Sequence, residues 1–200
     1  MASGFCEWRC VRIDELLPDA AAYASAYAGL PEWRRRKADA FRFEADKRRS
    51  VAAWMLVRRL LAEKGLDADA LTVTENEFGR PQFEPSVGIS FSLSHAGERV
   101  MAAVAEGPVG CDVEQVSPLR AGVAEAALAD DELKGLAAFP EGSERDRAFI
   151  RLWVRKESYA KMRGLGLALD PKSFSVVSGN LPCSFYDFDF ADGSLGCVCF

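Results

Sequence analysis

Two carboxylates, Asp112 and Glu114, alternate along the short apolar segment VGCDVE at residues 109–114. Successive side chains of a strand point to opposite faces, so both carboxylates project from one face and Cys111 points away from them. Their backbone positions are about 6.5–7 Å apart, which lets both reach one cation. Oxygen ligands of this kind suit Mg²⁺ or Mn²⁺ better than Zn²⁺. The alternative is an exposed edge strand whose polar face lies in water.

A third carboxylate, Glu157, lies in the segment FIRLWVRKESYAKM. It follows Trp153 by four residues and Ile150 by seven, so in a helix it continues an apolar stripe on which a glutamate is unusual. Lys161 lies one turn further along the same face. The two residues form either a surface ion pair worth about 0.3–0.5 kcal/mol or a pair that faces a cleft, and the apolar stripe favours the cleft.

The only histidine of the chain, His95, directly follows Ser94 in the segment SLSHAG. The residues before it alternate between apolar and small polar side chains, which predicts a strand that ends near this pair. A hydroxyl and an imidazole at a strand end, with Arg80 upstream in the turn sequence GRP, form a cradle that suits a phosphate group. A catalytic triad lacks support because the chain has no G-x-S-x-G sequence. The alternative is a histidine with a structural hydrogen bond.

Two long amphipathic helices are predicted to position these side chains. The first covers residues 34–64 and ends at a glycine, and the second covers residues 144–163 and ends at the segment GLGL. Arg49 lies on the apolar stripe of the first helix, so its guanidinium is either at the rim of the core or in a cleft.

Short strands account for much of the remaining chain, and an Ala-rich amphipathic stretch over residues 116–140 adds a helix that opens at DDEL. Each half of the sequence therefore contains one long helix and about three strands. The predicted strands are LTVT (71–74), VGISFSLS (87–94), RVMAAVAE (99–106), VGCDVE (109–114), FSVVS (174–178), CSFYDFDF (183–190) and GCVCF (196–200).

The composition excludes several classes of protein. Apolar residues make up 49% of the 200 residues and charged residues 28%, as in soluble globular chains. The sequence shows no secretory signal and no apolar run long enough to span a bilayer, so we expect a cytoplasmic protein without a membrane partner. The net charge of −5 argues against nucleic acid as a partner. Residues 31–64 carry eleven Lys and Arg against five Asp and Glu, which suits either an anionic ligand or a solvated helix face.

The six cysteines show no paired C-x-x-C spacing, so we expect thiols in a reducing compartment. Cys197 and Cys199 share one strand face, but no histidine motif completes a zinc site beside them. We therefore interpret the cysteines as small core residues.

Four segments, FGRP, FSLSHAG, VGCDVE and WVRKESYAKMRGLGL, together resemble the surfactin-type (Sfp-like) 4′-phosphopantetheinyl transferases in order and spacing. Each motif alone is weakly specific, whereas the set is highly specific, and the likeness extends from about Pro31 to Val177. The resemblance implies transfer of 4′-phosphopantetheine from coenzyme A to a serine of an apo acyl, peptidyl or aryl carrier protein, with release of 3′,5′-ADP and a requirement for Mg²⁺. Two alternatives stay open: a non-catalytic coenzyme A-binding module and a Mg²⁺-dependent diphosphate hydrolase.

The resemblance also implies an α/β fold of the α+β type. Two similar halves, related by a pseudo-twofold axis, each contain a small, mainly antiparallel sheet packed on one long helix. Residues 1–105 form the N-terminal half and residues 106–200 the C-terminal half, with coenzyme A bound between them. The tandem halves make a monomer the expected state.

Each expected site residue follows from the family motif that it matches. Asp112, Glu114 and Glu157 resemble the metal-binding acids, and either Glu157 or a metal-bound water is the implied base. Lys161 matches a lysine near the pyrophosphate, so Glu157 and Lys161 are the implied catalytic residues. Glu132 aligns loosely with a further acid. The implied coenzyme A contacts are Arg34, Lys37, Arg49, Arg80, Ser94, His95 and Lys161.

Overall fold

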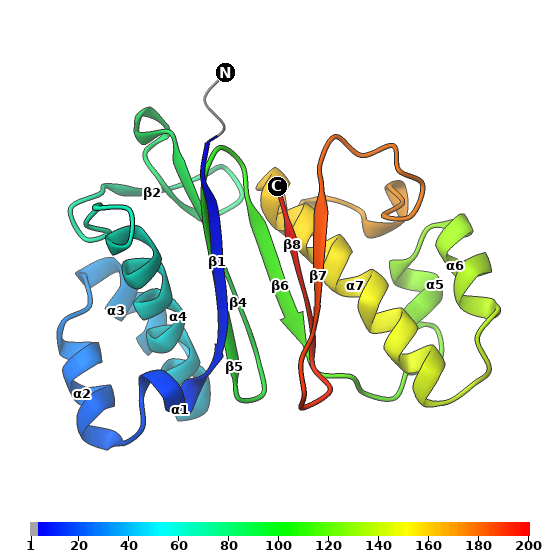
Figure 1. Cartoon of the computed structure of the whole chain (residues 1–200), viewed down its shortest axis with the longest axis horizontal. Coiled ribbons are helices and arrows are strands. Elements are labelled where there is room, and N and C mark those ends of the chain that lie inside the picture. The colour runs from blue at the N-terminus through cyan, green and yellow to red at the C-terminus, as the bar shows by residue number, and fades with distance from the viewer. Residues whose placement is uncertain (1–3) are drawn as a thin grey trace.

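The computed structural model describes residues 4–200 and arranges them in four layers (Figure 1). Two three-stranded antiparallel sheets lie at the centre, with the strand orders β1-β5-β4 and β6-β8-β7, and helices cover the outer face of each sheet. The strands are β1 (Cys6–Arg12), β4 (Ile89–Ala96), β5 (Arg99–Glu106), β6 (Gly110–Glu114), β7 (Phe185–Asp189) and β8 (Leu195–Cys199).

Each sheet has its own helices, of which one is long. The helices beside the first sheet are α1 (Ile13–Leu16), α2 (Ala20–Ala28), α3 (Glu32–Asp39) and α4 (Glu44–Ala62). Those beside the second sheet are α5 (Val123–Ala127), α6 (Asp130–Ala137) and α7 (Ser143–Arg163). A hairpin of β2 (Val73–Glu75) and β3 (Pro81–Phe83) and three short 3₁₀ helices, η1 (Pro85–Val87), η2 (Gly166–Ala168) and η3 (Pro171–Ser173), complete the described chain.

The expected fold class is confirmed, because the chain combines helices with antiparallel sheets in two similar arrangements. The division of the chain after residue 105 stays a prediction. That position lies at the end of β5, where the chain leaves the first sheet for the second.

Helix α4 forms the core of the N-terminal part with the first sheet. Its apolar residues recur every three or four positions, so they lie on one face and are buried against β4 and β5. Trp54 is fully buried and packs edge-on against Phe91 of β4, with 5.5 Å between the ring centroids. Acidic residues in the first turn of the helix agree with the positive end of its dipole.

The prediction of one continuous helix over residues 34–64 is wrong, because the chain breaks between α3 and α4 at residues 40–43. The break lets α3 fold back along α4. Trp33 then packs edge-on against Trp54 at 4.9 Å, and Arg34 donates a hydrogen bond to the carbonyl of Ser50 at 2.7 Å. A helix that continued through the break would gain little, because Phe41 and Phe43 have low helix propensity. The tertiary contacts of α3 with α4 therefore outweigh that gain.

The inner faces of the two sheets pack against each other and form a further core. Met101 and Ala103 of β5 meet Cys111 and Val113 of β6 there, all fully buried. The small polar face predicted for β4 is buried against β6, since the Ser92 hydroxyl accepts a hydrogen bond from the Cys111 amide at 3.0 Å. Serine side chains therefore join the two sheets where no backbone ladder exists.

Helix α7 lies unusually close to β6 because residue 110 is a glycine. A Cβ at this position would lie 1.9 Å from the carbonyl oxygen of Ser158 and 2.5 Å from the amide nitrogen of Met162. Only glycine permits this approach without a shift of the backbone. The helix therefore crosses directly over the strand that carries Asp112 and Glu114.

The predicted strand at residues 174–178 is wrong, because this segment is an irregular connection. Side chains, rather than a neighbouring strand, form hydrogen bonds with its backbone amides and carbonyls. Glu132 of α6 accepts a hydrogen bond from the Val176 amide at 2.7 Å, and Lys156 of α7 donates to the Phe174 carbonyl at 2.7 Å. The two side chains also form a buried ion pair at 2.7 Å, so Glu132 has a structural role.

The six cysteines are free thiols, as expected, and Cys111, Cys197 and Cys199 are buried. Burial raises the pKa of Cys111 to about 11, which keeps this thiol protonated at neutral pH. Within residues 4–200, no helix combines the length and the apolar character that crossing a membrane requires.

Replacing Gly110 with alanine should lower the free energy of unfolding by about 3 kcal/mol, since the new methyl group would meet the backbone of α7. Urea unfolding measures the loss. Gly135→Ala in α6 is the matched control, because a Cβ there has nothing within 4 Å and should stabilise the helix by up to about 1 kcal/mol. A G110A protein as stable as the wild type would contradict the close approach of β6 and α7.

Candidate active site

A cavity of about 640 Å³ lies where the two sheets and their long helices meet. Strand β6 contributes Asp112 and Glu114 on one face, as the alternation predicted, and α7 contributes Glu157 and Lys161. Eight of the ten expected site residues line this cavity. Its walls consist of Arg34, Lys37, Ala40, Phe41, Ser50, Ala53, Pro81, Leu93, Ser94, His95, Asp112, Glu114, Glu157 and Lys161.

Asp112 is the most constrained carboxylate of the cavity, with only 2% of the residue exposed. Its Oδ1 accepts hydrogen bonds from the Ser94 hydroxyl at 2.7 Å and from Lys161 Nζ at 2.6 Å. Its Oδ2 is buried without a hydrogen-bond partner among the described residues. An unpartnered buried carboxylate oxygen is costly, so this atom suits a ligand that carries positive charge.

Ser94 positions this carboxylate. A serine hydroxyl can donate only one hydrogen bond, and Ser94 donates it to Asp112. The expected contact of Ser94 with a phosphate would require that bond to be exchanged. The same hydroxyl accepts a long hydrogen bond of 3.4 Å from the Val113 amide, so it also holds β6 beside β4.

The charges around Asp112 set the protonation of its neighbours. Burial, followed by repulsion from Asp112, raises the pKa of Glu114 from the ordinary 4.5 to about 7. Burial also raises the pKa of Glu157, although the positive charge of Lys161 opposes the change. Burial, the largest single effect, would lower the pKa of Lys161, but Asp112 together with Cys111 and Glu157 outweighs burial, and the pKa is raised. Lys161 is therefore charged at neutral pH.

His95 lies near the end of β4, as predicted, and its ring faces the cavity beside Phe41, with 6.3 Å between the ring centroids. Burial, followed by the charges of Arg49 and Lys161, lowers the pKa of His95 below 6.5. The imidazole is therefore neutral at pH 7, with one nitrogen able to donate a hydrogen bond.

Helix α3 supplies a basic wall. Arg34 is only 7% exposed and has no carboxylate partner in the described chain, and its Nε has no hydrogen-bond partner there. Burial lowers the pKa of Arg34 to about 10, which still leaves it charged at neutral pH. Lys37 pairs with Glu75 of β2 at 3.2 Å. A buried guanidinium without a counter-charge suits an anionic ligand.

Ser50 and Phe41 line the cavity, and neither was predicted from the sequence. Within residues 4–200 the Ser50 hydroxyl is buried without a hydrogen-bond partner. In the sequence, only the position of Ser50 directly after Arg49 indicates that it could belong to the site. Phe41 lies in the break between α3 and α4, which the sequence analysis interpreted as helix.

Arg49 and Arg80 are not among the residues that line this cavity. Arg49 donates to the Gly97 carbonyl at 2.7 Å and pairs with Asp46 at 2.7 Å, and it lines a separate cavity of about 440 Å³. The guanidinium of Arg80 donates to three backbone carbonyls. The expected contacts of these two arginines with coenzyme A therefore stay predictions.

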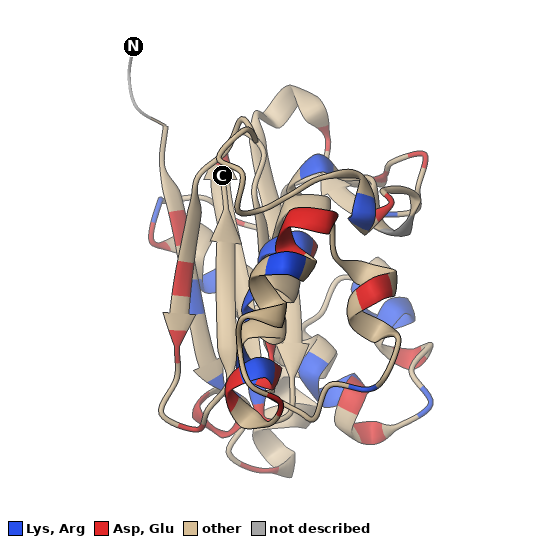
Figure 2. Cartoon of the chain, turned by 90° about the vertical axis from the view of Figure 1, so that its right-hand side faces the viewer, with Lys and Arg blue, Asp and Glu red and all other residues tan. Residues whose placement is uncertain are grey.

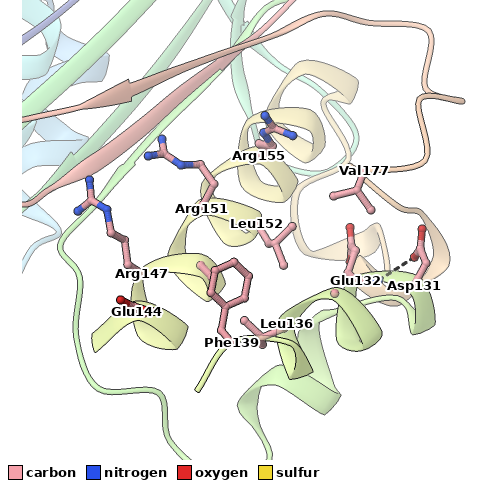
Figure 3. Close-up of a pocket in the computed structure, with 12 residues that line it drawn as sticks. Asp131, Glu132, Leu136, Phe139, Glu144, Arg147, Arg151, Leu152, Arg155 and Val177 are labelled. Carbon is pink, nitrogen blue, oxygen red and sulfur yellow. Dashed lines mark hydrogen bonds between the residues drawn. The ribbon is translucent and has the colours of Figure 1, made fainter. Parts of the chain in front are cut away.

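A second large cavity, of about 600 Å³, lies between α6 and α7 (Figure 3). It is lined by Glu132, the loosely aligned acid, and by none of the ten other expected site residues. Its inner wall is apolar and includes Leu136 and Leu152. Arg147 and Arg151 contribute their stems, while both guanidinium groups pair with Asp189 of β7. Lys and Arg residues are interspersed with Asp and Glu residues along the ribbon on this side of the molecule (Figure 2).

The first cavity thus contains one group that suits an anion and one that suits a cation. The unpaired guanidinium of Arg34 suits an anion, and the unpartnered oxygen of Asp112 suits a cation. In the described chain, no three His, Cys, Asp or Glu side chains are arranged to enclose a metal ion by themselves. A phosphate-bearing ligand that shares a cation with Asp112 would suit both the Arg34 guanidinium and the Asp112 oxygen.

Family models match nearly the whole chain. The model described as "4'-phosphopantetheinyl transferase, N-terminal" matches residues 15–107, and the model described as "4'-phosphopantetheinyl transferase superfamily" matches residues 108–190. The chain belongs to the 4′-phosphopantetheinyl transferase superfamily. The resemblance seen in the four sequence motifs is thereby confirmed.

Individual relatives agree with this membership. The chain is 33% identical over 145 residues to the 4′-phosphopantetheinyl transferase psf-1 of Bacillus pumilus, which covers 72% of this chain and 61% of the relative. It is 31% identical to the 4′-phosphopantetheinyl transferase Sfp of Bacillus subtilis, over 72% of this chain and 64% of the relative. A phosphopantetheinyl transferase of Rattus norvegicus, named for L-aminoadipate-semialdehyde dehydrogenase, is 26% identical over 77% of this chain and 54% of its own. The matched stretch thus spans less than two thirds of each of these relatives.

Without metal or ligand, Glu114→Gln should change how stability depends on pH. The raised pKa of Glu114 means that the folded state favours the protonated form, so its contribution is complete below pH 4.5 and is lost as the pH rises through 7. Between pH 5 and pH 8 the wild type should lose about 1–2 kcal/mol of unfolding free energy relative to E114Q.

Urea unfolding in EDTA at a series of pH values measures this difference. Glu125→Gln, which changes an exposed glutamate of α5, is the matched control and should follow the wild type. A difference between the wild type and E114Q that stays constant from pH 5 to pH 8 would show that Glu114 titrates normally.

Proposed function

We propose that this protein transfers the 4′-phosphopantetheine group of coenzyme A to a serine of an apo carrier protein and releases 3′,5′-ADP. The observation that carries the proposal is the cavity between the two sheets, which is lined both by Asp112, with its unpartnered buried oxygen, and by Arg34, whose guanidinium has no ion pair in the described chain. Membership of the 4′-phosphopantetheinyl transferase superfamily supports the same activity.

The phosphates of coenzyme A are assigned to the basic side of the cavity. Arg34, Lys37 and His95 line it from α3 and β4, and Ser50 of α4, whose buried hydroxyl has no partner among the described residues, lines it too. Neutral His95 offers one N–H group, whereas the guanidinium of Arg34 can hold two phosphate oxygens at once. Phosphate binding would give Arg34 the counter-charge that the described chain does not provide.

The donor set fits Mg²⁺, which prefers oxygen ligands and usually keeps waters and substrate phosphates beside one or two carboxylates. Asp112 would hold the ion through Oδ2, with Glu114 and Glu157 as neighbouring acids. When bound, Mg²⁺ supplies positive charge that stabilises the diphosphate as charge accumulates on its oxygens. A bound cation would also favour the ionised form of Glu114.

The transfer is a substitution at the β-phosphorus of coenzyme A. The oxygen of the carrier serine forms a bond to this phosphorus while the bond to the bridging oxygen of 3′,5′-ADP breaks. Glu157 would take the proton of the serine hydroxyl, and burial, which raises its pKa, makes it a stronger base than an exposed glutamate. Lys161 stays charged and stabilises the negative charge of the leaving group.

We propose an apo acyl, peptidyl or aryl carrier protein as the acceptor, in keeping with the names of the relatives as phosphopantetheinyl transferases. The expectations of a monomer, of a cytoplasmic location and of no nucleic-acid or membrane partner stay predictions.

Mass spectrometry of an apo carrier protein, incubated with the enzyme, coenzyme A and Mg²⁺, tests the proposal directly. The expected product is a carrier that has gained one 4′-phosphopantetheine group on a serine. Free 4′-phosphopantetheine without a carrier adduct would instead indicate a diphosphate hydrolase. Coenzyme A binding without any product, across a panel of carriers, would indicate a non-catalytic binding module.

Glu157→Gln should lower kcat for transfer more than about 100-fold, because the variant cannot accept the serine proton. The affinity for 3′,5′-ADP should change less than about threefold, as the basic side of the cavity is intact; calorimetry measures it. Glu144→Gln, at the exposed start of the same helix, is the matched control and should keep full activity. An active E157Q enzyme would remove Glu157 from the role of base.

A further inference from the structure

The β2–β3 hairpin of the N-terminal part reaches the C-terminal end of α7. The Asn76 side-chain amide donates to the Gly164 carbonyl at 2.7 Å, and Arg80 Nη1 donates to the Lys161 carbonyl. The last carbonyls of a helix lack partners within the helix and carry the negative end of its dipole. Two side chains from the hairpin therefore cap the helix end that carries Lys161.

Arg80 makes two further bonds with its other Nη. This nitrogen donates to the Phe91 carbonyl of β4 at 2.9 Å and to the Val109 carbonyl, directly before β6, at 3.2 Å. The planar guanidinium holds its donors in a fixed geometry, so it fixes its acceptors relative to one another. In the described chain no carboxylate pairs with Arg80.

Each carbonyl that Arg80 binds belongs to an element that carries part of the candidate active site. Strand β4 carries Ser94 and His95, strand β6 carries Asp112, and α7 carries Lys161. A single side chain thus connects the three elements whose side chains must converge in the cavity. Its terminal nitrogens are used by these carbonyls, and the guanidinium does not line the cavity.

Hydrogen bonds within the hairpin hold it in one conformation, so that it can hold the end of α7 in place. The side-chain oxygen of Asn76 accepts hydrogen bonds from the amides of Phe78 at 3.0 Å and Arg80 at 2.9 Å. Gly79 between them has a φ of +74°, a conformation that glycine adopts without strain. Glu75 also ties β2 to Lys37 of α3.

We infer that Arg80 is a positioning residue: it fixes the last turn of α7, and with it Lys161, relative to Asp112. This inference rests on the proposed transferase function. It differs from the coenzyme A contact that the family resemblance implies for Arg80. A positioning role predicts that loss of Arg80 lowers kcat and leaves ligand affinity unchanged. A ligand contact predicts that it lowers affinity and leaves kcat unchanged.

Steady-state kinetics of Arg80→Ala, together with calorimetric binding of 3′,5′-ADP, separates the two roles. We expect kcat to fall about 30–100-fold, because a small displacement of Lys161 misaligns it with the leaving group, and the Kd for 3′,5′-ADP to change less than threefold. Arg80→Lys should give an intermediate kcat, since an ammonium group cannot span three carbonyls. Asn76→Ala should lower kcat in the same direction but less.

Arg99→Ala is the matched control. Arg99 also joins the two sheets, through an ion pair with Asp192 at 2.7 Å, but within residues 4–200 it forms no hydrogen bond or ion pair with α7. Its loss should lower the melting temperature and leave kcat within twofold of the wild type. A fall in kcat as large as that of R80A would overturn the inference, because general loosening between the sheets would then explain both variants.

Two other results would overturn it. A Kd for 3′,5′-ADP that rises tenfold with kcat unchanged would make Arg80 a ligand contact, and an unchanged kcat and Kd below the unfolding temperature would make it merely structural. If R80A does not fold, R80K and N76A carry the same comparison. Hydrogen exchange of the amides at residues 159–164 should accelerate in R80A and not in R99A. This readout is independent of transfer, so failure of the proposed function remains distinguishable.

Discussion

The buried carboxylate of Asp112 is the constraint on which the rest of the site depends. A buried charge must be paired, and breaking such a pair costs about 3–5 kcal/mol. Ser94 of the first sheet and Lys161 of α7 both bond to Oδ1, so elements distant in sequence converge on one atom. The other oxygen has no hydrogen-bond partner among the described residues, and Asp112 lines the same cavity as Arg34, whose guanidinium has no ion pair there.

The fold keeps this convergence rigid from several directions. Glycine at position 110 lets α7 lie directly on β6, and serines of β4 bond to the backbone of β6. On the far side of α7, the fully buried pair of Lys156 and Glu132 fixes the helix to α6 and to the segment at residues 174–178. A packed and hydrogen-bonded frame of this kind limits how far the catalytic side chains can move.

The sequence predicted those features that depend on local periodicity. Alternation placed Asp112 and Glu114 on one face, and the apolar stripe placed Glu157 in a cleft. Features that depend on tertiary contacts were not predictable in this way. The break before α4 follows from Trp33 packing on Trp54, and the irregular segment at residues 174–178 follows from side chains that bind its backbone. The role of Arg80 is hidden for the same reason, because its acceptors are carbonyls far away in the sequence.

Binding of Mn²⁺, followed by electron paramagnetic resonance in the presence of coenzyme A, tests the central role of Asp112 most directly. Mn²⁺ is a suitable probe, since it prefers the same oxygen ligands as Mg²⁺. We expect one bound ion per chain and a loss of more than about tenfold in Mn²⁺ affinity in D112N, with coenzyme A still bound. Equal Mn²⁺ affinity in the wild type and in D112N would contradict it.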